Sequence, residues 1–213
     1  MFFKKERFGF NKEEISVLKK LNTPKKIQDF LNSLKINFEE NGETCMSPRM
    51  VLKTRKAHCM EGAMFAAAAL RFHSHPPLIL DMETTPEDED HVVTLFKVGN
   101  HWGAIGKTNH SVLRYREPIY KTTRELVLSF FHEYFMEDTR KKTLRRYSSP
   151  INLAKFDKLG WMTSEDDVWY IPDYLSKINH KNLLSRKQAR NLRKADPIEI
   201  RAFQIKEHEK ETD

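Results

Sequence analysis

The order of apolar and polar positions predicts two amphipathic helices at the start of the chain. Asn11 and Glu14 have the spacing of a capping box, and apolar residues then recur every three or four positions. Thr23-Pro24 is a second start signal, because threonine caps a helix and proline fits its first turn. A second apolar stripe follows it. We therefore expect two consecutive helices that end near residue 36.

The middle of the chain changes from a helical pattern to a strand pattern. The segment CMEGAMFAAAALRF is rich in alanine and nearly uncharged, which predicts a helix that is buried on all sides. PLILDM is typical of a short buried strand. HVVTLFKV and HWGAIGKTNH flank Gly99-Asn100, a turn signal that favours a hairpin. A helix followed by three strands with antiparallel pairing is therefore expected.

The second half of the chain carries weaker patterns. TRELVLSFFHEYF predicts a helix, whereas residues 140–180 show no dominant period, and Pro172 is expected to break a helix in WYIPDYL. SRKQARNLRKA is typical of a basic helix, IEIRAFQI after Asp196-Pro197 favours a strand, and the tail KEHEKETD is expected to be frayed. The sequence alone does not order these elements.

Length and composition place the chain among ordinary globular proteins. Its 213 residues include 14 Phe, enough for one domain with a full core. Two cysteines are too few for a disulfide framework, the start MFFKKERFGF lacks a signal peptide, and no segment approaches the roughly 20 apolar residues of a membrane span. A cytoplasmic protein without membrane contact is expected. The net charge of +7 arises from mixed charges and favours no partner class.

Cys59 and His91 are the candidate catalytic residues. A thiol ionises more easily at a helix N-terminus and beside an imidazole, and Cys59 begins the predicted buried helix. His91 opens a predicted strand directly after an acidic run, so its ring can face a helix packed on the same sheet. Glu61 opposes ionisation of the thiol. On spacing alone, a structural cysteine on an apolar helix remains the commoner case.

Three stretches of the sequence resemble a known enzyme family. They are HCMEGAMFAAAALR, DHVVTLFKVGNHWGAIGK and, more weakly, TPKKIQDFLNSL. Together they resemble the transglutaminase-like superfamily, a branch of the papain-type cysteine enzymes. Cys59 falls on that family's nucleophile at the start of a central helix, and His91 on its base at the head of a strand. Trp102 falls on the Trp that precedes the third catalytic residue. The resemblance covers about residues 20–110.

The sequence departs from the family at the third catalytic position. Gly106 stands where the family has an Asp, and glycine has no side chain to orient the imidazole. Asn109 is the best substitute, because papain-type sites can use Asn in this role. Asp90 and Asp81 are other candidates. The catalytic set expected here is therefore Cys59, His91 and Asn109, with no cofactor and no metal.

The resemblance implies acyl transfer from a protein or peptide amide. A Cys59 thiolate would attack the carboxamide, backbone N–H groups would stabilise the tetrahedral species, and a thioester would form. His91 would protonate the leaving amine, and an amine or water would accept the acyl group. A cysteine peptidase or amidase on the same site is one alternative. A catalytically inactive member that binds a protein or nucleic acid is the other.

Other chemistry-bearing residues favour structural roles. Cys45 lies in a polar loop, and His58 is adjacent to Cys59 but is expected to point elsewhere. The acidic run at 87–90 lacks the spacing of a calcium loop, and no metal-binding motif occurs. The basic segment 181–194 predicts a helix with residues 186, 190, 193 and 194 on one face, which could contact an acidic partner.

The fold class expected is α+β, papain/transglutaminase-like, with helices packed on one side of a small antiparallel sheet. Residues 1–120 would form the catalytic core. Residues 121–213 would form a mostly helical extension packed on it, a single domain being the alternative.

Overall fold

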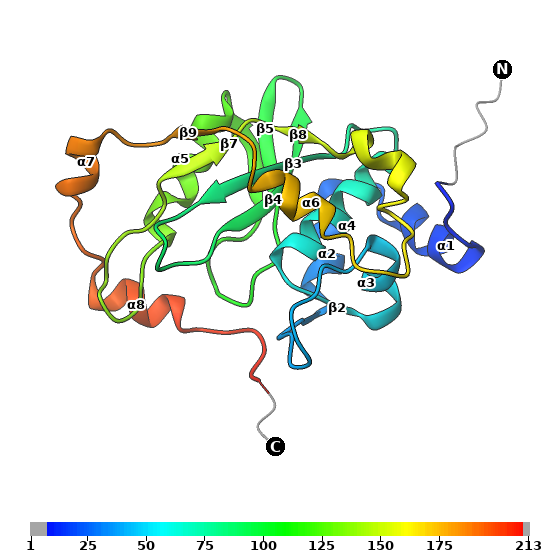
Figure 1. Cartoon of the computed structure of the whole chain (residues 1–213), viewed down its shortest axis with the longest axis horizontal. Helices are drawn as coiled ribbons and strands as arrows, with labels where there is room; N and C mark the ends of the chain where they lie inside the picture. The colour runs from blue at the N-terminus through cyan, green and yellow to red at the C-terminus, as the bar shows by residue number, and fades with distance from the viewer. Residues whose placement is uncertain (1–7, 211–213) are drawn as a thin grey trace.

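An antiparallel sheet of seven strands forms the centre of the molecule in the computed structural model, which describes residues 8–210 (Figure 1). The strand order is β6-β5-β4-β3-β7-β9, and β8 also pairs with β3. The strands are β3 (Leu78–Glu83), β4 (His91–Val98), β5 (His101–Ile105), β6 (Arg116–Tyr120), β7 (Arg146–Ser148), β8 (Ile151–Asn152) and β9 (His180–Asn182). A separate parallel pair joins β1 (Lys35–Ile36) to β2 (Lys56–Ala57).

The strand β4 is buried on both faces of the sheet. Val92 and Phe96 pack into one apolar cluster, while Val93 and Leu95 pack into the other. Successive side chains of a strand point to opposite faces, so both faces of this strand must be covered. This explains why HVVTLFKV shows no alternation of apolar and polar residues.

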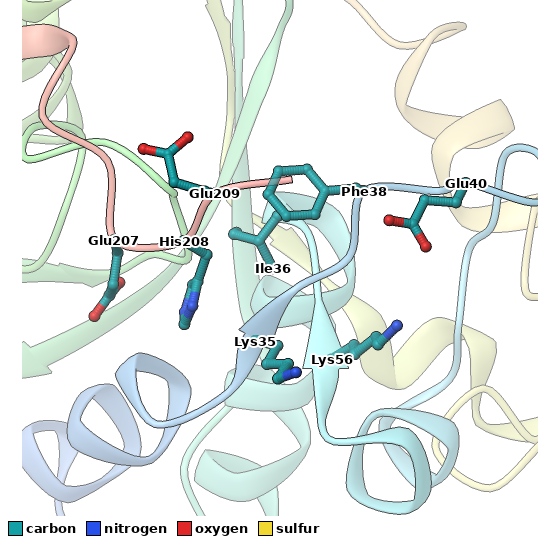
Figure 2. A pocket seen from close by; sticks show the side chains of 8 residues that line it. All are labelled: Lys35, Ile36, Phe38, Glu40, Lys56, Glu207, His208 and Glu209. Carbon is teal, nitrogen blue, oxygen red and sulfur yellow. The ribbon is translucent and has the colours of Figure 1, made fainter. Parts of the chain in front are cut away.

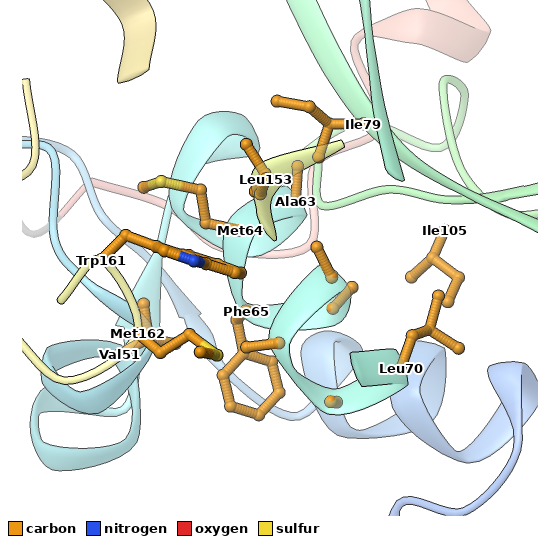
Figure 3. Close-up of a cluster of buried hydrophobic side chains, with 14 of the residues drawn as sticks. Val51, Ala63, Met64, Phe65, Leu70, Ile79, Ile105, Leu153, Trp161 and Met162 are labelled. Carbon is orange, nitrogen blue, oxygen red and sulfur yellow. The ribbon is translucent and has the colours of Figure 1, made fainter. Parts of the chain in front are cut away.

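The helix α4 (Cys59–Phe72) covers one face of the sheet, packed mainly against β4. Around it lie α1 (Lys12–Lys20), α2 (Pro24–Asn32) and α3 (Pro48–Thr54) (Figure 1). Figure 3 shows Met64 and Phe65 of α4 among buried side chains from both halves of the chain, including Trp161. A Cβ on Gly62 would lie 2.5 Å from the Cβ of Lys107, so glycine lets the chain after β5 approach the helix closely.

The opposite face of the sheet is covered by α5 (Thr123–Phe130) and the short 3₁₀ helix η1 (Phe131–Glu133). Leu126, Val127 and Phe130 of α5 join Leu80 and the inward residues of β4 in the second cluster. Helices therefore lie on both faces of the sheet, and the expectation that they cover one side is wrong.

The sequence signals of the first half are confirmed. Asn11 and Glu14 form the capping box of α1, and Thr23 with Pro24 starts α2. The buried helix begins at Cys59, and β4 and β5 form the predicted hairpin around Gly99-Asn100. The α+β class with helices packed on an antiparallel sheet is also confirmed.

The second half differs from the expectation of a mostly helical extension. Its strands β7, β8 and β9 extend the same sheet as β3, so the sheet crosses the expected boundary at residue 120. Its remaining elements are η2 (Leu153–Leu159), α6 (Tyr170–Leu175), α7 (Arg186–Arg190) and α8 (Pro197–Phe203).

Three local expectations in this half are wrong for physical reasons. Pro172 does not break α6, because it lies in the first turn, where no intrahelical N–H is needed. IEIRAFQI begins as helix α8, since Asp196 and Glu199 form a capping box around Pro197 at the first helical position. Part of the tail is paired, because Lys206 bridges to His110. Residues 211–213 of that tail lie outside the described residues.

Candidate active site

Cys59 is the first residue of α4 and lies partly exposed at its N-terminus. It lines an open cleft of about 560 Å³ together with His58 and His91. Burial on its own would raise the pKa of the Cys59 thiol. Hydrogen bonds to His58 and His91, and the charges of both rings, outweigh burial and lower that pKa from 9.0 to about 5. The thiol therefore ionises well below neutral pH.

His58 is the N-cap residue of α4, directly before the cysteine. Its Nδ1 accepts from the backbone N–H of Met60 at 3.3 Å, and its Nε2 lies 3.1 Å from the carbonyl oxygen of Thr44. Burial would lower the pKa of His58. The hydrogen bond to Cys59 and the charges of Cys59 and Glu61 outweigh burial and raise it to about 9.

Glu61 is a fully buried carboxylate in the first turn of α4. It accepts from the backbone N–H of His58 at 3.0 Å and of Met46 at 3.0 Å, and from the side chains of Thr44 and Asn37. Its Oε1 lies 3.4 Å from Nε2 of His58. The sequence signal for this arrangement is the capping-box spacing of His58 and Glu61.

His91 is the first residue of β4 and is buried beside the thiol, as the sequence predicts. Its Nε2 is buried and has no hydrogen-bond partner among the described residues. A Cβ on Gly106 would lie 3.5 Å from this nitrogen. Gly106, at the position of the family's third catalytic residue, therefore faces His91. A glycine offers the Nε2 of His91 no side-chain acceptor.

Asn109 does not fill this gap. Its Nδ2 donates to the carbonyl of His208 at 2.9 Å, and its Oδ1 accepts from the N–H of His208 at 2.9 Å. The predicted orienting role is therefore wrong for this structure, because both polar atoms of the amide hold the C-terminal segment. Asp81 is hydrogen-bonded to His180 at 2.9 Å, and Asp90 accepts from the N–H of Thr84 at 2.8 Å.

The C-terminal segment that Asn109 holds runs beside the parallel pair of β1 and β2. A pocket of about 330 Å³ separates the two, and Figure 2 shows the side chains that line it. They are Glu207, His208 and Glu209 on one side and Lys35, Ile36, Phe38, Glu40 and Lys56 on the other. Earlier in the C-terminal segment, the ring of Phe203 stacks on His110 with centroids 3.8 Å apart. Both residues line the cleft of Cys59, so the C-terminal segment forms part of the wall of that cleft.

The remaining lining of the cleft combines acidic and apolar side chains. Residues 87–90 contribute acidic side chains, and Lys107 and Lys206 supply positive charge. The hydroxyl of Tyr134 is buried there without a hydrogen-bond partner among the described residues. Trp102 was expected near the third catalytic position. The Nζ of Lys97 lies 4.2 Å from the centroid of its ring, and Trp102 is not among the residues that line the cleft.

Burial, followed by the charges of Glu61 and Asp167, raises the pKa of the Cys45 thiol to about 12. Within residues 8–210, no cluster of His, Cys, Asp and Glu side chains has the arrangement of a metal site. The basic face expected at 186, 190, 193 and 194 does not form, because α7 ends at Arg190.

His58 is a neighbour of the Cys59 thiol that sequence reasoning considered and set aside. Adjacent residues at a helix start were expected to diverge, but an N-cap ring folds back over the first turn of its own helix.

No protein-family model and no curated protein matches this chain. In the part of the chain that the structure describes, no helix combines the length and apolar character needed to cross a membrane.

Proposed function

We propose that this chain is a cysteine-dependent acyltransferase that acts on protein or peptide amides through a thioester, in the manner of the transglutaminase-like branch of papain-type enzymes. The observation that carries this proposal is the thiol of Cys59, which lies at a helix N-terminus in an open cleft with its pKa lowered to about 5. A thiol that serves only as a small apolar side chain has no need of two imidazole neighbours.

The mechanism follows from the positions of the groups. The Cys59 thiolate attacks the amide carbonyl, and the new C–S bond gives a tetrahedral oxyanion. Backbone N–H groups in the first turn of α4, where Cys59 lies, stabilise that oxyanion. A ring N–H protonates the departing amine, the thioester forms, and an amine or water then accepts the acyl group.

The acceptor decides between transfer and hydrolysis. A glutamine-containing peptide is incubated with the protein, with and without excess primary amine, and the products are separated by mass spectrometry. Transfer gives the amine adduct and ammonia, whereas an amidase gives the free acid in both samples. The absence of both products, with Cys59→Ser as the blank, would exclude acyl transfer from this donor.

One observation favours the inactive binding module instead. Among residues 8–210 the Nε2 of His91 has no acceptor, because Gly106 stands where the family has an Asp. An inactive member would bind its partner equally well as Cys59→Ala and would release no ammonia. If the protein is an enzyme, a group other than His91 must take the proton of the Cys59 thiol.

A further inference from the structure

Two imidazole rings flank the sulfur of Cys59, but their outer nitrogens have very different surroundings. The Nε2 of His58 faces only acceptors: the Thr44 carbonyl at 3.1 Å, Glu61 at 3.4 Å and Glu39 at 3.8 Å. The Nε2 of His91 is buried without a partner among the described residues. A buried imidazolium with an unpaired N–H is costly, so the protein is built to carry positive charge on His58.

These contacts also fix the tautomer of neutral His58. Since Nε2 faces acceptors, it carries the hydrogen, and Nδ1 presents its lone pair to the start of α4. The N–H of Met60 uses that lone pair at 3.3 Å, a long contact. Cys59 is the next residue and lines the same cleft, and its interaction with this ring lowers the pKa of the thiol. Nδ1 is therefore the ring atom that takes the proton of the thiol, and its contact with the N–H of Met60 is then lost.

We propose that His58, held by Glu61 and the Thr44 carbonyl, is the base that ionises Cys59, so that a Cys59–His58–Glu61 set replaces the set left incomplete at Gly106. The S–H bond breaks, the Nδ1–H bond forms, and the products are a thiolate and an imidazolium, with no other reactant. This assignment rests on the proposed acyl transfer for its catalytic meaning. The proton transfer itself occurs without substrate.

The charges around the pair support this direction of transfer. Glu61 and Glu39 face the imidazolium, and the ring of His91, from β4, supplies a hydrogen bond that favours the thiolate. Asp81 and Tyr134 also act on the thiolate and, when charged, oppose it. Glu61 is the decisive group, because it is fully buried and little screened by solvent.

The test compares two matched variants, His58→Asn and His91→Asn. Asparagine is a good N-cap, so His58→Asn keeps an acceptor for the first turn of α4 and removes only the titrating ring. The rate of Cys59 alkylation by iodoacetamide is followed against pH by peptide mass spectrometry. We expect His58→Asn to move the midpoint from near 5 toward the ordinary thiol value of about 8.5, and His91→Asn to move it less. The reverse order would overturn the proposal.

The fold of each variant is checked in the same experiment. Cys45 is buried, so its alkylation at neutral pH reports unfolding. If His58→Asn unfolds, ¹⁵N NMR of the histidine rings in the unaltered protein decides the matter. His58 should remain doubly protonated at pH 7 and lose that proton after Cys59 is alkylated. A neutral His58 ring at pH 7 would contradict the assignment.

Failure of the proposed function gives a different result from failure of this assignment. If amide turnover is absent but His58→Asn still moves the alkylation midpoint, acyl transfer is wrong and His58 remains the base. If amide is turned over while the midpoint stays in place, the assignment to His58 is wrong and acyl transfer stands.

Discussion

The two cysteines of this chain share Glu61 as a neighbour and have opposite chemistry. Cys45 lies in the loop whose next residue, Met46, donates its N–H to Glu61 at 3.0 Å. Cys59 lies two positions before the same carboxylate, beside His58. Burial raises the pKa of both thiols, yet the pKa of Cys45 is about 12 and that of Cys59 about 5. Burial therefore does not decide the reactivity of a cysteine here.

The sign of the neighbouring charge decides it. Cys45 faces Glu61 and Asp167, which repel a thiolate directly. Cys59 has His58 beside it, and Glu61 favours the imidazolium of His58, which in turn favours the thiolate. One carboxylate thus suppresses one thiolate and supports the other. A neighbouring imidazole is sufficient to reverse the effect of the carboxylate.

The largest expected effect is the difference in alkylation between the two thiols. At pH 7 their pKa values imply thiolate populations that differ by about five orders of magnitude. The more acidic thiolate is the weaker nucleophile, which leaves roughly a 100-fold advantage for Cys59 before access is considered. Peptide mapping of iodoacetamide adducts over time measures both rates in one sample. Equal alkylation rates of Cys45 and Cys59 in the folded protein would contradict the predicted difference between the two thiols.

The next effect is expected from Glu61→Gln, which acts on both cysteines at once. Without the carboxylate, the alkylation midpoint of Cys59 should rise and that of Cys45 should fall, because the charge supports one thiolate and repels the other. The amide would also face donors from His58 and Met46, so the free energy of unfolding should drop by about 2 kcal/mol. Urea unfolding and peptide mapping measure these changes. Glu39→Gln, at a half-buried position farther from His58, is the matched control.

A smaller effect is expected in the dependence of stability on pH. The lowered pKa of Cys59 contributes stability that is complete above 9.0 and is lost as the pH falls through about 5. The raised pKa of His58 contributes stability that is complete below 6.5 and is lost as the pH rises through about 9. Between pH 6.5 and 9 the two contributions change stability in opposite directions as the pH changes. Between pH 5 and 6.5 only the contribution of Cys59 changes with pH.

Chemical unfolding of the unaltered protein and Cys59→Ser tests this pH dependence. Their difference in free energy of unfolding should be nearly constant from pH 6.5 to 9 and should shrink toward pH 5. Asp81, whose pKa burial raises to about 6, titrates in both proteins, so its contribution is largely removed from the difference. A difference that grows on acidification would contradict a resting thiolate.

Local sequence signals predicted most of the first half of the fold. Capping residues, the alanine-rich segment and the Gly99-Asn100 turn act over a few positions, and each element they predict is present. The short strands of the second half are stabilised by distant pairing, such as Arg146 with Asn182, and no local period marks them. Sheet membership in that half is a tertiary property.

The candidate site divides in the same way. The position of Cys59 at a helix start, and of His91 beside it, follows from short-range patterns. The partner of Asn109 is His208, a contact between distant parts of the chain that strand register alone cannot predict. His58 was within reach of sequence reasoning, since its spacing to Glu61 is that of a capping box.

The smallest effect is expected from Asn109→Ala, which separates the anchoring role of this residue from the catalytic role that the sequence favoured. Loss of the two hydrogen bonds to His208 should cost about 1 kcal/mol and increase hydrogen exchange at the His208 amide. The alkylation midpoint of Cys59 should stay unchanged, because neither polar atom of Asn109 meets His91. A shift of that midpoint, with normal exchange at His208, would return Asn109 to the catalytic set and remove the need for His58 as the substitute base.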